Sequence, residues 1–168
     1  MEDVGQPVAN ELDRSREAYA NGYYQKKLAQ GQELEDFVGV VLYKCGIVTM
    51  PFASKLFQQT RGENMLGAEI KNDERFRETG NLYIETAEKS HPNNPNYTPS
   101  GIQREDNTWL YVIGDRSCLW IFSKTMLKGL ARSYNYENKE TPTSLGFLLP
   151  LADADKYAAK KIEPSELH

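Results

Sequence analysis

The sequence predicts a single α/β domain in which a central mixed β-sheet is flanked by α-helices. Three observations predict this fold class. Apolar residues recur at helical spacing over residues 34–45, which is typical of a helix with one buried face. Two apolar runs, at 109–113 and 118–122, are separated by a short turn segment and indicate a hairpin of buried strands. The 168 residues, 39% of them hydrophobic, are enough for one core.

The N-terminal part of the domain, which spans residues 1–168, is predicted to be helical. Residues 1–8 are polar and indicate a flexible tail, and residues 9–31 indicate a polar helical extension. A second helix follows, and Gly46 stands where its C-terminal cap belongs. One apolar face of this helix runs through Leu34, Phe37, Val38, Val41, Leu42 and Cys45.

The other predicted elements are short. A strand at 47–50 and a helical turn at 53–60 precede two strands at 65–72 and 81–88. Residues 91–107 hold three prolines and four asparagines and are expected to form a long loop. The order of the remaining elements is a helix at 123–134, a strand at 146–149 and a helix at 152–162.

Composition narrows the classes of function. No apolar run is long enough to span a bilayer, and the acidic N-terminus is unlike a secretory signal, so we expect a cytoplasmic protein that does not enter a membrane. Cys45 and Cys118 lie in apolar runs and are expected to be reduced core residues. The net charge of −4 argues against a protein that coats nucleic acid without specificity, but it allows a local basic groove.

Basic and aromatic residues offer two further expectations. The residues we expect to contact phosphate are Arg61, Arg75, Arg77 and Lys124, with a solvated charged surface as the competing interpretation. Trp109 and Tyr111 alternate in strand fashion and are expected in the core, as are Trp120 and Phe122.

Acidic and basic side chains converge on the two strands at 65–72 and 81–88. Because side chains alternate faces along a strand, Glu69, Lys71 and Asp73 share one side of the first strand. By the same alternation, Glu85 and Lys89 share a side of the second. Acidic groups gathered in this way are costly to bury unless they bind a cation or exchange protons. Magnesium, which prefers hard oxygen ligands, is the natural ion for them. Ion pairing on a solvated sheet face is the competing interpretation.

This order of a helix, strands with acidic residues, and further strands and helices resembles the core of the PD-(D/E)xK nuclease superfamily, which includes restriction endonucleases and Holliday-junction resolvases. The resemblance covers residues 32–134 and implies a restriction-endonuclease-like core. In that superfamily an acidic residue ends one strand, and a (D/E)xK tripeptide lies on the next. Asp73 and Glu85 fit the two carboxylates, and Glu35 is similar to the glutamate that many members carry on the preceding helix.

The sequence departs from this motif at Ala87, where the family's lysine should stand. Three explanations compete. The lysine has moved to Lys89 or Lys71; or Glu69-Ile-Lys71 is itself the tripeptide, with Glu63 or Asp73 as its partner; or catalysis has been lost. We favour a working site with a displaced lysine, because a cluster of this kind would destabilise a fold that did not use it.

The resemblance implies a metal-dependent endonuclease that hydrolyses phosphodiester bonds in DNA, duplex or branched, and a homodimer would let two sites address two strands. Carboxylate-bound Mg²⁺, which Mn²⁺ can replace, would activate the water. The predicted metal ligands are Asp73, Glu85, Glu69 and Glu35, and the predicted catalytic residues are Glu69, Lys71, Asp73, Glu85 and Lys89. The alternatives are an inactive nucleic-acid-binding or regulatory protein on the same scaffold and an interaction protein of unrelated fold. The form of the nucleic acid stays open.

Overall fold

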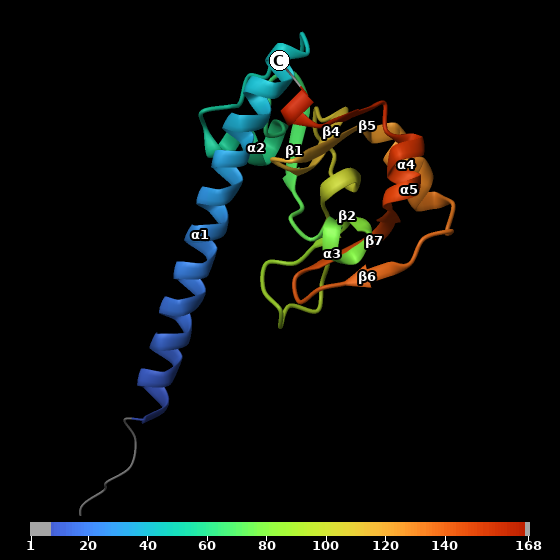
Figure 1. Cartoon of the computed structure of the whole chain (residues 1–168). Coiled ribbons are helices and arrows are strands. Elements are labelled where there is room, and N and C mark those ends of the chain that lie inside the picture. The colour runs from blue at the N-terminus through green and yellow to red at the C-terminus, as the bar shows by residue number, and fades with distance from the viewer. Residues whose placement is uncertain (1–7, 167–168) are drawn as a thin grey trace, which may run out of the picture.

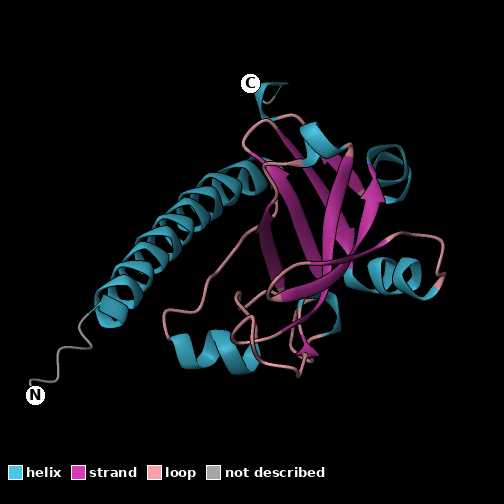
Figure 2. Ribbon diagram, turned by 90° about the horizontal axis from the view of Figure 1, so that it is seen from below, coloured by secondary structure: helices cyan, strands magenta, loops and turns pink. Residues whose placement is uncertain are grey.

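The computed structural model describes the backbone of residues 8–166, and side chains within that range except those at 8–21, 23–24, 27–28, 59 and 166. The expected tail therefore lies outside the described residues, apart from Val8. The chain has the α/β class that the sequence predicts, but its described strands divide between two four-stranded sheets instead of forming one. The first sheet has the order β1-β4-β5-β8 and the second β3-β2-β7-β6. Figures 1 and 2 show the strands with the helices around them.

Helix α1 runs from Val8 to Lys44 without a break, where two helices were expected. The helix passes through Gly31, because one glycine inside a helix costs only about 1 kcal/mol relative to alanine. The predicted apolar face is confirmed. Leu34, Val38, Val41 and Leu42 are buried against one face of the first sheet, with Phe37 and Cys45 partly buried beside them. The rest of α1 extends away from the two sheets (Figure 1).

The first sheet is mixed. β1 (Ala68–Asn72) runs parallel to β4 (Leu110–Asp115), while β5 (Cys118–Ser123) is antiparallel to both β4 and β8 (Lys160–Ile162). The β4–β5 hairpin is confirmed. Alternate residues of β4 face two different cores: Leu110 and Val112 face α1, whereas Tyr111 and Ile113 face the core that includes the second sheet.

The second sheet is antiparallel and is centred on β2 (Asn81–Glu88) and β7 (Ser144–Pro150). Its edge strands are β3 (Thr98–Pro99) and β6 (Asn138–Glu140). The core that it shares with the first sheet also receives side chains from α3 (Phe76–Thr79), α4 (Lys124–Arg132) and α5 (Leu151–Tyr157). The remaining short helices are α2 (Lys55–Arg61) and the 3-10 turns at Gly101–Gln103 and Pro164–Glu166.

Several expectations about short elements are wrong. The last helix ends at Tyr157 instead of continuing to 162, because Lys160–Ile162 pairs with β5 and buries Ile162 against α1. Residues 47–50 form no strand. Within the expected loop 91–107, Thr98–Pro99 pairs with β2. Trp109 is 60% exposed instead of lying in the core, and its indole nitrogen donates to the carbonyl of Leu66.

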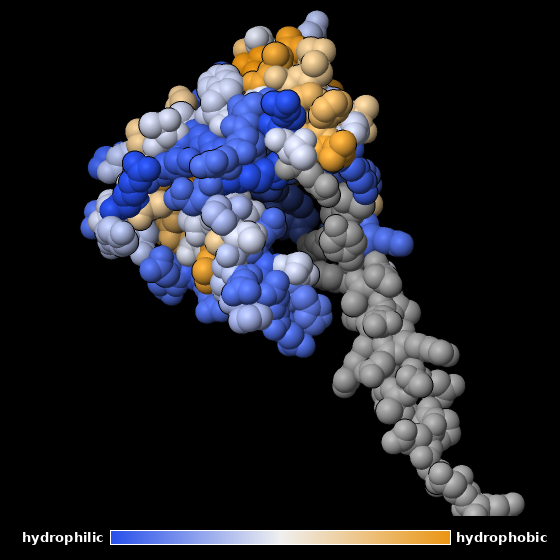
Figure 3. All heavy atoms as spheres, turned by 180° about the vertical axis from the view of Figure 1, so that it is seen from behind, coloured by the Kyte–Doolittle hydropathy of each residue, from blue (hydrophilic) through white to orange (hydrophobic). Residues whose placement is uncertain are grey.

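Apolar side chains also gather on the surface at the end of the molecule where α1 ends (Figure 3). The large exposed apolar residues are Val40, Tyr43, Val48, Met50, Leu56, Phe57, Met65, Leu66, Trp109, Met126 and Tyr134. Among the described residues, no helix has the length and apolar character that crossing a membrane requires.

Candidate functional site

The two strands that carry the predicted carboxylates lie in different sheets, and the site is built between them. Glu69 and Lys71 project from β1, and Glu85 projects from β2. Glu35 of α1 and Glu63, in the segment between α2 and β1, interact electrostatically with Lys71. We call these five residues the Lys71 cluster. The fold therefore brings together Glu35, Glu69, Lys71 and Glu85 from the predicted site, and adds Glu63.

Glu69 is the anchor of the cluster. Its side chain is 1% exposed, and its Oε1 lies 2.6 Å from the Lys71 ammonium. Its Oε2 accepts from the hydroxyl of Tyr111 at 3.1 Å and from that of Thr108 at 3.4 Å. A buried carboxylate is tolerated when it is paired and hydrogen-bonded in this way. Glu69 therefore holds Lys71 in place and has few lone pairs left for another ligand.

Lys71 stays protonated in this environment. Burial alone would lower the pKa of its ammonium, but the carboxylates of Glu69 and Glu63 outweigh burial, and the net effect raises the pKa. The Glu63 carboxylate lies 3.9 Å from the ammonium. A lysine with a raised pKa is a poor proton acceptor near neutral pH. Its chemical use is to stabilise negative charge on a bound group.

The other carboxylates lack enough positive charge to balance them. The pKa of Glu63 is raised by burial and by Glu69, although Lys71 opposes the change. The pKa of Glu35 is raised by burial and by Glu63. Burial also raises the pKa of Glu85, against the hydrogen bond from Ser100 and the charge of Lys71. A raised carboxylate pKa means that the ionised form is disfavoured here. A bound cation would stabilise that ionised form.

Glu85 is positioned by a β-bulge and by a turn from elsewhere in the chain. The ladder between β2 and β7 shifts register between Glu85 and Ala87. Ser100 donates from its hydroxyl to Glu85 Oε1 at 2.8 Å, and its N–H donates to the carbonyl of Thr86. Gly101 has φ +50°, and a Cβ there would lie 2.3 Å from the Glu85 carbonyl oxygen. Only glycine allows this close approach.

The bulge also explains the departure at Ala87. Glu85 pairs with Gly146 and Ala87 pairs with the adjacent Leu145, so Ala87 lies on the opposite face from Glu85. A lysine at this position would project away from the cluster. Lys89 lies beyond the end of β2, and its ammonium sits 4.8 Å from the centre of the Tyr97 ring. Lys71 is therefore the lysine that the fold places among the carboxylates.

Asp73 lines the same cavity as Lys71 and Glu85, but its carboxylate accepts hydrogen bonds from backbone N–H groups. Its Oδ1 accepts from the N–H of Arg75 at 3.0 Å, and its Oδ2 accepts from the N–H of Tyr83 at 2.9 Å. These bonds tie the chain after β1 to the start of β2. Asp73 therefore has a structural use that the sequence does not reveal.

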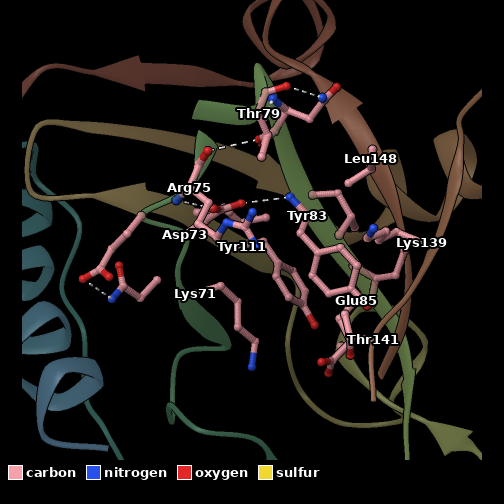
Figure 4. A pocket seen from close by; sticks show the side chains of 17 residues that line it. Lys71, Asp73, Arg75, Thr79, Tyr83, Glu85, Tyr111, Lys139, Thr141 and Leu148 are labelled. Atoms are coloured by element: carbon pink, nitrogen blue, oxygen red, sulfur yellow. Dashed lines mark hydrogen bonds between the residues drawn. The ribbon is translucent and has the colours of Figure 1, made fainter. Parts of the chain in front are cut away.

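A cavity of about 590 Å³ opens between the two sheets beside these residues. Lys71, Tyr111 and Glu85 point toward one end of it, Arg75 and Thr79 lie toward the other, and Tyr83 stands between (Figure 4). A second cavity of about 320 Å³ includes Glu35 and Glu63 in its lining. Glu85 therefore reaches the larger cavity and Glu35 and Glu63 reach the smaller one, whereas Glu69 lines neither.

The basic residues expected to bind phosphate lie in four different settings. Arg61, the last residue of α2, is exposed. Arg75 lies in the lining of the larger cavity and within 4.0 Å of Glu78. Arg77 pairs with Asp115 at 3.4 Å.

Lys124 does not fit the expectation. It is buried, and its ammonium donates to Asp106 Oδ1 at 2.7 Å and to the carbonyl of Arg104 at 2.6 Å. Its position inside an ion pair leaves it unable to reach a phosphate without breaking that pair.

The donor set of the Lys71 cluster suits Mg²⁺ in chemistry, because carboxylate oxygens are the hard ligands that this ion prefers. Glu35, Glu63 and Glu85 have the raised pKa values that a cation would offset. Among the side chains that the structure describes, however, no three from His, Cys, Asp or Glu are grouped closely enough to hold a metal ion. Binding Mg²⁺ would therefore require these glutamates to move.

The search for known relatives returned nothing: the chain matches no protein-family model, no curated protein and no solved structure. The function proposed below therefore rests on the geometry of this chain.

Sequence reasoning missed the residues that support the cluster. Tyr111 was expected only as a core residue, and Ser100 and Gly101 fell within a loop. Tyr83 carries no signal beyond its position two residues before Glu85. The pair Ser100-Gly101 could have been noticed, because a glycine after a hydroxyl residue in an otherwise long loop marks a close backbone approach.

Proposed function

We propose that this protein is a metal-dependent nuclease that hydrolyses phosphodiester bonds in DNA at the Lys71 cluster. One observation carries the proposal: Lys71 is held 2.6 Å from the buried Glu69, and it lines the larger cavity together with Glu85, while Glu35 and Glu63 line the smaller cavity. Perturbed carboxylates around a fixed cation are typical of sites that handle charge during a reaction. We also propose that the fold has a restriction-endonuclease-like core.

Each residue of the cluster has a use in this reaction. Glu85 from the larger cavity, and Glu63 and Glu35 from the smaller one, are the carboxylates that would hold Mg²⁺ once these side chains move. When bound, the ion polarises a phosphate oxygen and lowers the pKa of a water molecule. Lys71, fixed by Glu69, offsets the negative charge that grows on the phosphate oxygens as the water oxygen bonds to phosphorus.

The proton released by the water passes to one of the carboxylates of raised pKa, which accept protons more readily near neutral pH. The bond from phosphorus to the leaving sugar oxygen breaks, and that oxygen takes a proton from solvent. Lys71 is the lysine at the site, so Glu69-Ile-Lys71 would serve as the (D/E)xK tripeptide. The segment that begins at Glu85 has Ala87 where that tripeptide needs a lysine.

The test combines DNA cleavage with a readout that does not depend on activity. Purified protein is incubated with labelled DNA in Mg²⁺, Mn²⁺ or EDTA, beside Lys71→Met and Glu85→Gln variants. We expect cleavage to need the metal and to fall at least about a hundredfold in both variants. We also expect Mg²⁺ to raise the melting temperature of the wild type and not that of Glu85→Gln.

Glu137→Gln is the matched control, because Glu137 is exposed and lines none of the cavities described above. Wild-type cleavage in Lys71→Met, or an equal rise in melting temperature with Mg²⁺ in the wild type and Glu85→Gln, would contradict the proposal. A second candidate is an inactive nucleic-acid-binding or regulatory protein, which the lack of a three-carboxylate group among the described residues favours. DNA binding without cleavage in any metal would select it.

A further inference from the structure

The larger cavity has two chemically different ends. Lys71, Glu85 and the hydroxyl of Tyr111 lie at one end, where we propose that hydrolysis takes place (Figure 4). Arg75, Thr79 and Asn81 line the other end and provide polar groups. Apolar contacts come from the walls, which include Ile102 and Leu148. A ligand that fits would carry an anionic group, a flat apolar group and polar edges.

Tyr83 supplies a fixed aromatic surface in the middle of the cavity. Its hydroxyl is hydrogen-bonded to Ser144 Oγ at 2.9 Å, and Asp73 accepts from its N–H. Its ring packs so closely on Gly146 that a Cβ there would lie 2.7 Å from ring atom Cε2. The ring is partly exposed to the cavity. A rigid, accessible ring of this kind is a platform on which a nucleic-acid base can stack.

Lysine and arginine side chains flank this platform. Lys139, on the edge strand β6, is exposed and lines the cavity beside Tyr83 (Figure 4). Arg75 is exposed at the far end. Together with Lys71 they provide positive charges at three places around the ring. Three carboxylates, those of Asp73, Glu74 and Glu85, also line the cavity, so phosphates would bind at the three cations and not along an evenly positive wall. Cationic side chains beside an aromatic platform are the pattern of proteins that bind unpaired strands.

The size of the cavity favours unpaired DNA over paired DNA as its ligand. Its 590 Å³ lies within the range of pockets that enclose a small molecule, and it can hold one or two nucleotides. A base in a duplex is stacked and paired, so it can enter such a recess only after it leaves the helix. Ile102, Tyr111 and Ile113 line the cavity and are each at most 2% exposed, so the cavity reaches into the core between the sheets.

We propose that the cavity between the sheets binds an unpaired DNA strand, with a base on Tyr83 and flanking phosphates on Lys139 and Lys71. Single-stranded DNA is then the substrate class, and intact duplex is excluded. This inference rests on the proposed nuclease function, since it names the substrate of the same site.

The first measurement is binding in EDTA, where no cleavage takes place. Fluorescence anisotropy compares a labelled single-stranded oligonucleotide with the same strand in a blunt duplex. We expect the single strand to bind at least about tenfold more tightly. Tyr83→Ala and Lys139→Glu should each weaken its binding by about tenfold, whereas Tyr83→Phe keeps the ring and should bind as the wild type does.

Lys55→Glu is the matched charge control, because Lys55 is exposed on α2 and lines none of the cavities described above. Thermal unfolding of every variant confirms that the fold is intact, and Tyr83→Phe separates a lost ring from a lost hydrogen bond to Ser144. The second measurement is cleavage of a circular single strand and of a relaxed closed-circular duplex in Mg²⁺. Neither circle has ends, so only internal cleavage is scored.

Three outcomes are distinguishable. Preferred binding and cleavage of the single strand, both weakened by Tyr83→Ala and Lys139→Glu, support the inference. Single strand and duplex bound or cleaved within twofold of each other, or variants without effect, overturn it even if the protein is a nuclease. Preferred binding of the single strand with no cleavage of either circle supports the binding cavity and overturns the proposed hydrolysis.

Discussion

Two charged clusters lie side by side in this protein and are balanced in opposite ways. The Lys71 cluster surrounds one ammonium with four carboxylates. The second, which we call the Asp106 cluster, surrounds one carboxylate with two cations: Asp106 lies 2.7 Å from Lys124 and 2.9 Å from Arg104. Burial would raise the pKa of Asp106, but hydrogen bonds from Lys124 and from the N–H of Thr108 outweigh it, and the pKa is lowered. The Asp106 cluster balances the charge of its carboxylate, whereas the Lys71 cluster leaves carboxylate charge that a bound cation could balance.

This difference separates a structural use of charge from a binding use. The Asp106 cluster holds the chain together, since Arg104 also donates to the carbonyl of Gln58 in α2 and Lys124 to the carbonyl of Arg104. It thereby fixes the segment that carries Ser100 and Gly101 against Glu85. The structural cluster supports the position of the cluster that we propose to be catalytic.

The largest expected effect is on the Asp106 cluster. Asp106→Asn removes the charge that the buried Lys124 and the partly buried Arg104 share, and breaking a buried pair in this way costs about 3–5 kcal/mol. Glu63→Gln should instead leave the free energy of unfolding unchanged or raise it, because it removes a disfavoured charge. Urea denaturation at pH 7 measures both. A loss below about 1 kcal/mol in Asp106→Asn, or a larger loss in Glu63→Gln, would show that the two clusters do not differ.

The link between the clusters can be broken at Gly101. Gly101→Ala places a Cβ against the Glu85 carbonyl and forces alanine into a left-handed conformation, which together cost about 1–3 kcal/mol. It should also displace the Ser100 hydroxyl from Glu85 and lower DNA cleavage. Gly129→Ala in α4 is the control, since a Cβ there meets nothing within 4 Å, and it should stabilise by about 0.4–1 kcal/mol. Equal denaturation curves for the two variants would show that Glu85 is not held by this turn.

The sequence predicted the parts of the fold that depend on periodicity. The apolar face of residues 34–45 and the β4–β5 hairpin follow from spacing alone, and both are confirmed. Alternation along β1 correctly gave Glu69 and Lys71 a common side. Alternation along β2 failed after Glu85, because a bulge adds one residue and turns Ala87 to the other face.

Other misses came from contacts between distant segments. The sequence gives no sign that Lys124 meets Asp106 or that Asp73 caps the N–H of Tyr83, because these partners are far apart along the chain or join backbone to side chain. Glu63 was named from the sequence only as one possible partner of Glu69-Ile-Lys71, because it lies in an irregular segment where no period fixes its direction. The final residues were assigned to a helix because local propensity could not anticipate the pairing of β8 with β5.

The smallest expected effect is the pH dependence of stability, where the two clusters have opposite signs. Glu35, Glu63 and Glu85 have pKa values above their unfolded values, so the folded state binds protons more tightly and stability falls as pH rises from about 4.5 through the raised values. Asp106 has a lowered pKa, so its contribution is present above about pH 4 and is lost as pH falls further.

Wild type should therefore be more stable near pH 5 than at pH 7, by about 1 kcal/mol or less after solvent screening. Glu63→Gln should flatten this slope, whereas Glu137→Gln, which alters an exposed carboxylate outside both clusters, should keep it. Urea denaturation from pH 4.5 to 7.5 gives the slopes for all three proteins. If the free energy of unfolding changed with pH equally in wild type and Glu63→Gln, ionisation of the carboxylates around Lys71 would not destabilise the fold. The proposed difference between the two clusters would then be wrong for the Lys71 cluster.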